Sequence, residues 1–284
     1  MIRKEHTDKP NVFIEQGVPL VLTVVIFVLL SVLIFIEIRF LNLATATDIV
    51  TKLRWVDVLV GLTIYLKTSV DFAIFIGNLM ATYPGMKNRI AIEVGTALGN
   101  ALGTIVVLAI WDFFRDIEWL LAIMITLAAL VLFKLAQEGL EHASEEKSRY
   151  PWWFANTILY FERTLLIINN TIAPILRYIV PNLSMKQNRS LSFWGLFVTS
   201  FTIPFILGLD DFAGYVPVFN IVNVFGFSVG VLAGHMILNI FLFVSPKKTI
   251  TIVKNPIISF FGSVAFVALA IWGLFEVVKI LFLH

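Results

Sequence analysis

Residues 93–104, EVGTALGNALGT, place a glycine at every fourth position, at Gly95, Gly99 and Gly103. Residues 225–236, FGFSVGVLAGHM, repeat this spacing at Gly226, Gly230 and Gly234. Small residues at this interval lie along one side of a helix and let helix backbones approach closely within lipid. The two stretches therefore predict two membrane helices that each pack tightly against a partner.

The composition places the whole chain among integral membrane proteins. Of its 284 residues 59% are hydrophobic and 14% are charged, and the mean hydropathy is +0.91. A soluble domain has about 25% charged residues. The absence of cysteine excludes a disulfide framework and a thiolate metal site. A formal charge of +2 without a basic stripe gives no reason to expect binding to nucleic acid.

Seven apolar segments are each long enough to cross a bilayer, which takes about 20 helical residues. They cover about 18–38, 55–80, 90–114, 118–136, 192–219, 221–244 and 256–282. The first exceeds the apolar core of a signal peptide, which is about 7–15 residues, so we expect a retained anchor helix. Tryptophans at span ends indicate an aromatic belt, at Trp55, Trp111, Trp119 and Trp194. Aspartates near span ends are expected at the interface, at Asp57, Asp112 and Asp116.

The distribution of lysine and arginine predicts the orientation. With the N-terminus inside, the inner segments hold 15 of these residues and the outer segments hold 5. Positive charge gathers on the cytoplasmic side of membrane proteins. The sequence thus predicts a protein of the cell (inner) membrane with a cytoplasmic N-terminus and an external C-terminus.

One long connection, residues 137–191, lies between the apolar segments at 118–136 and 192–219. Its apolar part, 151–180, is interrupted by polar residues that would be costly in hydrocarbon: Glu162, Arg163, Asn169, Asn170 and Arg177. We expect an interfacial helix on the cytoplasmic face, with Trp152 and Trp153 as anchors, over the alternative of a further crossing.

An internal repeat relates the segments on either side of this connection. Trp55 is followed at intervals of eight by Thr63 and Asp71, and Trp194 is followed at the same intervals by Thr202 and Asp210. A glycine stripe comes after each. Because each half has an odd number of crossings, the halves would lie inverted, as in many secondary transporters. The predicted units are a tail, anchor and outer loop (1–54), a first repeat (55–136), the linker (137–191) and a second repeat (192–284).

Acidic residues inside the spans are the main functional candidates, because such residues are rare in lipid. Asp71 and Asp210 occupy matching places, and Asp211 adjoins the second. A shared central site needs tilted or interrupted helices, which Pro204, Gly208, Pro217 and Gly77 would permit. The alternative is that each aspartate only caps a broken half-helix.

Further candidates lie near these acids. Lys67, four residues before Asp71, would form a neutralising pair with it or act as a built-in cation that substrate displaces. Thr68 and Thr202 would supply hydroxyl oxygens, or would bond to the preceding helical turn. Glu93 is a site residue or an interfacial one. His235 matches no ligand spacing and is a helix-contact residue or a proton relay.

Two motifs resemble a known group of transporters. GLDDFAGYVPVF (208–219) resembles the second-half signature of the cadmium-resistance transporter family, and KTSVDFAIFIGNL (67–79) resembles the first-half motif of that family and of TerC-type proteins. Both belong to the lysine-exporter (LysE) superfamily. The resemblance covers about 55–136 and 192–282 and implies two inverted three-helix repeats. It also implies export of a divalent cation such as Cd²⁺ or Mn²⁺, with acidic site residues at Asp71 and Asp210. Lys67 departs from what a cation site would contain.

The predicted protein is thus an all-α, seven-helix exporter of a divalent metal cation and no enzyme. Oxygen ligands from Asp71, Asp210 and Asp211 suit Mn²⁺, Ca²⁺ or Mg²⁺, and carboxylates that lose protons on binding a metal would couple transport to protons. The cation is substrate, and no cofactor is expected. A homodimer through the glycine-rich helices is the expected assembly. The alternatives are an exporter of a cationic amino acid or other organic solute, and a membrane scaffold that transports nothing.

Overall fold

The computed structural model describes residues 12–44, 48–144, 151–179, 191–219, 222–253 and 255–282, and each element within these ranges is a helix. Only the backbone is described at 12–16, 19–20, 71, 141–144, 175–179, 207–214 and 253. The helices are α1 (Val12–Ala44), α2 (Trp55–Thr68), α3 (Val70–Thr82), α4 (Met86–Arg115), α5 (Glu118–Ser144), α6 (Trp152–Ile179), α7 (Phe193–Phe219), α8 (Val224–Val244), α9 (Pro246–Val253) and α10 (Pro256–Phe282).

Several of these helices are suited to a bilayer. In the described part of the chain five are long and apolar enough to cross it, namely α1, α4, α5, α8 and α10. A sixth crossing results if α2 and α3 form one span, which is bent by 66°. The prediction of an all-helical membrane protein is confirmed at this level. Seven crossings remain a prediction, since α7 meets the apolar criterion only over the shorter stretch Phe193–Ile206.

The predicted span at 55–80 is interrupted at Ser69, between α2 and α3. Ser69 has φ −85° and ψ 23°, and its N–H still donates to the carbonyl of Tyr65, so it closes the last turn of α2. Gly77, which we expected to permit a break, lies inside α3 instead. A Cβ atom there would lie 2.8 Å from Ile250 Cδ1 of α9, so this glycine allows close packing. Helix α9 itself was not predicted.

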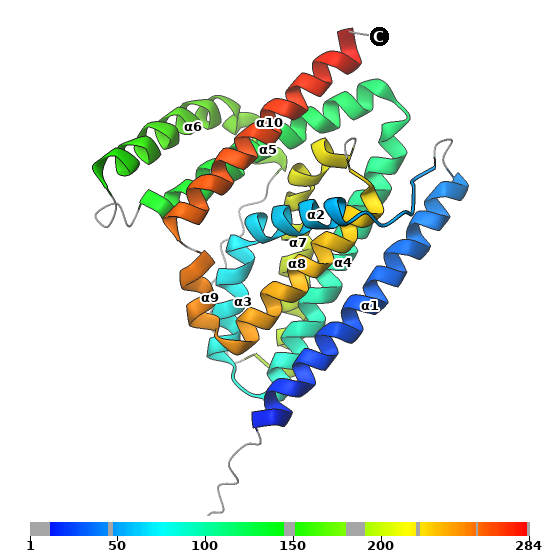
Figure 1. Cartoon of the computed structure of the whole chain (residues 1–284), viewed down its shortest axis with the longest axis vertical. Helices are drawn as coiled ribbons and strands as arrows, with labels where there is room; N and C mark the ends of the chain where they lie inside the picture. The colour runs from blue at the N-terminus through cyan, green and yellow to red at the C-terminus, as the bar shows by residue number, and fades with distance from the viewer. Residues whose placement is uncertain are drawn as a thin grey trace, which may run out of the picture.

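The helices before the linker pack mainly against the helices after it (Figure 1). We call these two groups of helices the two sides of the molecule. The most extensive contacts join α4 to α7, α2 to α8, and α5 to α10. Helix α1 runs along α8 and α4, and α3 lies beside α9. The main partner of each of these helices therefore lies on the other side of the molecule and is not adjacent to it in sequence. The anchor helix α1, which belongs to neither predicted repeat, contributes buried side chains such as Ile34 and Ile38.

The glycine stripes make two of these contacts. Gly95 and Gly99 of α4 lie against α7, and a Cβ on Gly95 would lie 2.7 Å from the carbonyl oxygen of Phe197. Gly230 and Gly234 of α8 lie against α2 in the same way, where Gly230 abuts the carbonyl oxygen of Val58. The prediction of tight helix packing is confirmed. Because the glycines are covered within one chain, a homodimer through these faces would have to displace α2 and α7.

The connection between the sides contains one long helix, α6, which packs on α5 at one edge of the bundle (Figure 1). Ile158 and Leu165 are buried in this contact, and the amide of Asn169 donates to the carbonyl of Phe133 at 3.1 Å. The opposite face exposes Trp152 and Tyr160, at 77% and 79%. This two-sided character agrees with a helix that lies along an interface, and α6 is absent from the helices that qualify as spans among the described residues.

Candidate functional site

The predicted acidic residues lie on the helices that we expected. Asp71 is the second residue of α3, directly after the break at Ser69, and Asp210 and Asp211 lie within α7. Their side chains fall outside the described part of the structure. Among the described side chains no group of three or more His, Cys, Asp or Glu residues could hold a metal ion. The proposed metal ligands therefore remain a prediction.

Lys67, in the last turn of α2, reaches across to α10. Its ammonium donates to the backbone carbonyls of Ile258 and Ser259 at 3.1 and 3.2 Å. The stem of the side chain passes over Gly262, where any Cβ atom would collide with it. Lys67 thus fastens the end of the broken helix to the last helix of the chain, and this arrangement favours a structural role.

The two threonines differ in their surroundings. The Thr68 hydroxyl donates to the carbonyl of Tyr65 at 3.1 Å, which is the local bond to the preceding turn that we gave as the alternative. Thr202 is exposed on the outside of α7, as Thr63 is on α2. A role of Thr68 and Thr202 beside Asp71 and Asp210 remains a prediction, because the side chains of these acids lie outside the described part of the structure.

Glu93 is the residue that the structure singles out. It lies on α4 with no exposed surface, so the reading as an interfacial residue is wrong. Thr23 of α1 donates a hydrogen bond to Glu93 Oε1 at 2.8 Å, and the Thr96 hydroxyl donates to the backbone carbonyl of Glu93 at 3.0 Å. The other carboxyl oxygen, Oε2, is buried and has no hydrogen-bond partner among the described residues. No ion pair to Glu93 occurs among the described side chains.

A line of hydrogen-bonded side chains continues from this acid across the bundle. Asn239 donates to the Thr96 hydroxyl at 3.2 Å and lies 3.1 Å from His235 Nε2. His235 Nδ1 lies 2.6 Å from the Tyr65 hydroxyl. We call this line the polar chain, and its members are at most 2% exposed: Thr23, Tyr65, Glu93, Thr96, His235 and Asn239.

The polar chain contains one imidazole, whose tautomer follows from its two hydrogen-bond neighbours. A neutral imidazole has one donor and one acceptor nitrogen, and the two tautomers differ in which is which. The Asn239 amide nitrogen can only donate, so His235 Nε2 accepts from it, and Nδ1 carries the proton and donates to the Tyr65 hydroxyl oxygen. The polar chain thus runs from Tyr65 through His235, Asn239 and Thr96 to the backbone carbonyl of Glu93, and its imidazole and carboxyl group are the groups that can bind a proton.

The polar chain joins helices from both sides of the molecule and from the anchor. Thr23 comes from α1, Tyr65 from α2, Glu93 and Thr96 from α4, and the remaining two members from α8. Sequence reasoning named Glu93 and His235 but missed Thr23, Tyr65 and Thr96. The only available signal was that Asn239 follows His235 by one helical turn, which puts both on one face; partners on other helices leave no such trace.

A second polar region lies where α2 and α8 begin and α4 ends. The Arg54 guanidinium bonds to both oxygens of Asp57 at 2.6 and 3.0 Å, and Arg115 pairs with Asp112 at 2.8 Å. Asp57 and Asp112 lie in the first turn of α2 and the last turn of α4, at the span ends where we expected them, and they are 2% and 0% exposed. The hydrogen bond to Asp57 and its negative charge raise the pKa of Arg54, which keeps the guanidinium charged.

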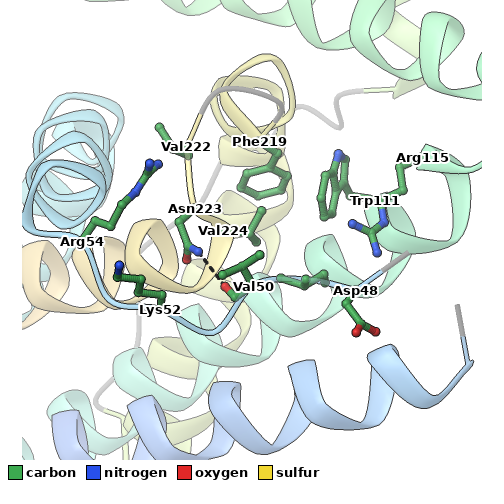
Figure 2. Close-up of a pocket in the computed structure, with 11 residues that line it drawn as sticks. Asp48, Val50, Lys52, Arg54, Trp111, Arg115, Phe219, Val222, Asn223 and Val224 are labelled. Carbon is green, nitrogen blue, oxygen red and sulfur yellow. Dashed lines mark hydrogen bonds between the residues drawn. The ribbon is translucent and has the colours of Figure 1, made fainter. Parts of the chain in front are cut away.

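These ion pairs border a pocket of about 420 Å³ (Figure 2). Its charged lining comes from Asp48, Lys52, Arg54 and Arg115, and Trp111 and Phe219 form an aromatic wall. Trp111 was expected in the aromatic belt but is only 4% exposed. The Arg115 guanidinium carbon lies over its ring, 5.0 Å from the ring centroid. A cation packed on a ring is stabilised by the electron-rich face, which accounts for the burial of this tryptophan.

Comparisons with protein-family models, with curated proteins and with solved structures found no match to this chain.

Proposed function

We propose that the chain is a proton-coupled secondary transporter of the lysine-exporter type, and that it exports a divalent cation. The observation that carries the proposal is the polar chain. A carboxyl group without a cationic partner is costly in hydrocarbon and is rarely kept there without a function. Here Glu93 accepts from two threonines, and the second of these, Thr96, is joined through Asn239 to a histidine on the other side of the bundle.

The inverted-repeat plan is part of this proposal, and the exchange of helices supports it. In a twofold arrangement, the contact of α2 with α8 corresponds to that of α4 with α7, and α5 meets its own counterpart α10. The register agrees as well. Val58 follows Trp55 by three residues and Phe197 follows Trp194 by three, and each carbonyl lies against a glycine, Gly230 and Gly95.

For the cargo we propose a cation of the Cd²⁺, Mn²⁺ or Ca²⁺ type, bound by Asp71, Asp210 and Asp211. The support is the matched position of the acids after Trp55 and Trp194 and the resemblance of their motifs. The break before Asp71 adds to this support, because transporter sites are commonly built where a helix is interrupted. In this proposal the N-terminus is cytoplasmic, and protons enter as the cation leaves.

The alternative of an organic solute requires Lys67 to bind the solute's carboxylate. The two hydrogen bonds from Lys67 to α10 speak for a structural role and against that use. For the same reason Lys67 is compatible with a cation site, because its ammonium group bonds to carbonyl groups of α10.

Uptake into proteoliposomes tests the cargo. We expect Mn²⁺, Ca²⁺ or Cd²⁺ to be transported by the wild type, and the double change Asp71→Asn, Asp210→Asn to lower the rate at least about tenfold, because two ligand charges are lost. Asp116→Asn, which changes an exposed aspartate at the end of α4, is the matched control. Absence of flux for all three ions, or full flux by the double variant, would contradict the proposal.

A further inference from the structure

The pocket beside the two ion pairs has a lining with an excess of positive charge. Lys52, Arg54 and Arg115 are three cations from two separate parts of the chain, and Asp48 is the one acid in the lining. In Figure 2 the two arginines stand on opposite sides, with Asn223 and Val50 between them. We propose that this pocket binds a phosphate group, carried by a phospholipid headgroup or free in solution.

The arginines are held in place by the acids behind them. Arg54 uses two of its five N–H donors on Asp57, so its fork is oriented before any ligand arrives. Arg115 is fixed by Asp112 and by the Trp111 ring. Guanidinium groups match the geometry of phosphate oxygens, and prior fixation lowers the entropy lost on binding.

Backbone groups add to the positive potential. Helices α2 and α8 both begin beside the pocket, and the first N–H groups of a helix favour an anion. Asn223 caps α8 by accepting from the N–H of Gly226 at 3.1 Å. Its amide also donates to the carbonyl of Val50 at 2.6 Å, so the loop that holds Lys52 is tied to the start of α8.

The surroundings indicate how a lipid would reach the pocket. Val50 of the lining is 60% exposed, and two exposed aromatic residues adjoin lining residues in sequence, Trp55 after Arg54 at 75% and Phe113 two residues before Arg115 at 69%. Exposed aromatic and aliphatic side chains beside charged ones are typical of the level where headgroups meet hydrocarbon. A phospholipid could rest its acyl chains on these residues and place its phosphate in the pocket.

Lys52 is the residue to change, because it is exposed and has no ion pair among the described residues. Loss of Arg54 or Arg115 would instead leave a buried aspartate uncompensated. The purified full chain in neutral detergent is titrated with dioctanoyl phosphatidylglycerol, dioctanoyl phosphatidylethanolamine, inorganic phosphate and dioctanoylglycerol, and thermal unfolding is followed. Lys279→Gln, which removes the same charge at the end of α10, is the matched control.

We expect stabilisation of the wild type by at least one of the three phosphate compounds and none by dioctanoylglycerol. Lys52→Gln should weaken the apparent affinity about fivefold, since one basic residue contributes about 1 kcal/mol near a lipid phosphate. Lys279→Gln should bind as the wild type does, and Asp48→Asn should bind phosphatidylglycerol more tightly. A response to the lipids alone assigns a headgroup, and a response to inorganic phosphate assigns the free ion. No response to any phosphate compound, an equal response to dioctanoylglycerol, or unchanged binding by Lys52→Gln would overturn the proposal.

Discussion

The buried carboxyl groups of the polar chain and of the pocket have partners of different charge. At the pocket, Asp57 and Asp112 are each neutralised by an arginine three residues away on the same chain segment. In the polar chain, the Glu93 carboxyl group accepts a hydrogen bond from the neutral hydroxyl of Thr23. A carboxylate with a fixed cationic partner stays charged, whereas one among neutral hydrogen-bonding groups is able to gain and lose a proton. In the proposed function, the acids at the pocket have a structural role and Glu93 exchanges protons.

The largest effect on stability is expected at the pocket. Arg115→Gln leaves Asp112 buried and without its cation, and breaking a buried pair in this way costs about 3–5 kcal/mol. Thermal unfolding in detergent measures the loss. Adding Asp112→Asn should recover most of the stability, because the uncompensated charge is then gone. A double variant less stable than Arg115→Gln would show that charge neutralisation is not what the pair provides.

The next effect concerns the contacts that bring the halves together. A Cβ on Gly99 would collide with the carbonyl of Phe201, and one on Gly230 with that of Val58. We expect Gly99→Ala and Gly230→Ala each to lower the free energy of unfolding by about 1–3 kcal/mol through overpacking. Gly195→Ala on α7 is the control, since its Cβ would meet only side chains at 3.5 Å or more. Similar losses at all three positions would mean that helix–helix contact is not the reason for the glycines.

The smallest effects are expected within the polar chain. Tyr65→Phe removes the contact with His235, and Thr23→Val removes the donor to Glu93; each should cost about 1 kcal/mol. If the six side chains act as one network, the double variant should deviate from additivity by about 0.5 kcal/mol or more. Strict additivity would mean that the two contacts are independent of each other. The polar chain would then consist of separate local contacts, as the ion pairs at the pocket do.

Sequence reasoning predicted the helical membrane class, the glycine contacts and the residues that deserve attention, because hydropathy and spacing act within one segment. It matched Gly95 with Gly226, whereas the structure gives Gly95 and Gly230 equivalent contacts, one helical turn away. A stripe with a period of four looks the same after a shift of one turn, so the register depends on the partner helix. The burial of Asp57, Asp112 and Trp111 likewise depends on arginines and neighbouring helices whose approach no local pattern encodes.

The central claim is that Glu93 carries the proton, and proton movement in proteoliposomes tests it most directly. With a trapped pH dye and a Mn²⁺ gradient, or a Ca²⁺ or Cd²⁺ gradient where that ion is the one transported, the wild type should move protons against the cation. Glu93→Gln keeps the shape and the acceptor for Thr23 but cannot lose a proton in the same way, so we expect its proton flux to fall about 10²-fold or more. Proton flux by Glu93→Gln equal to that of the wild type would contradict the account.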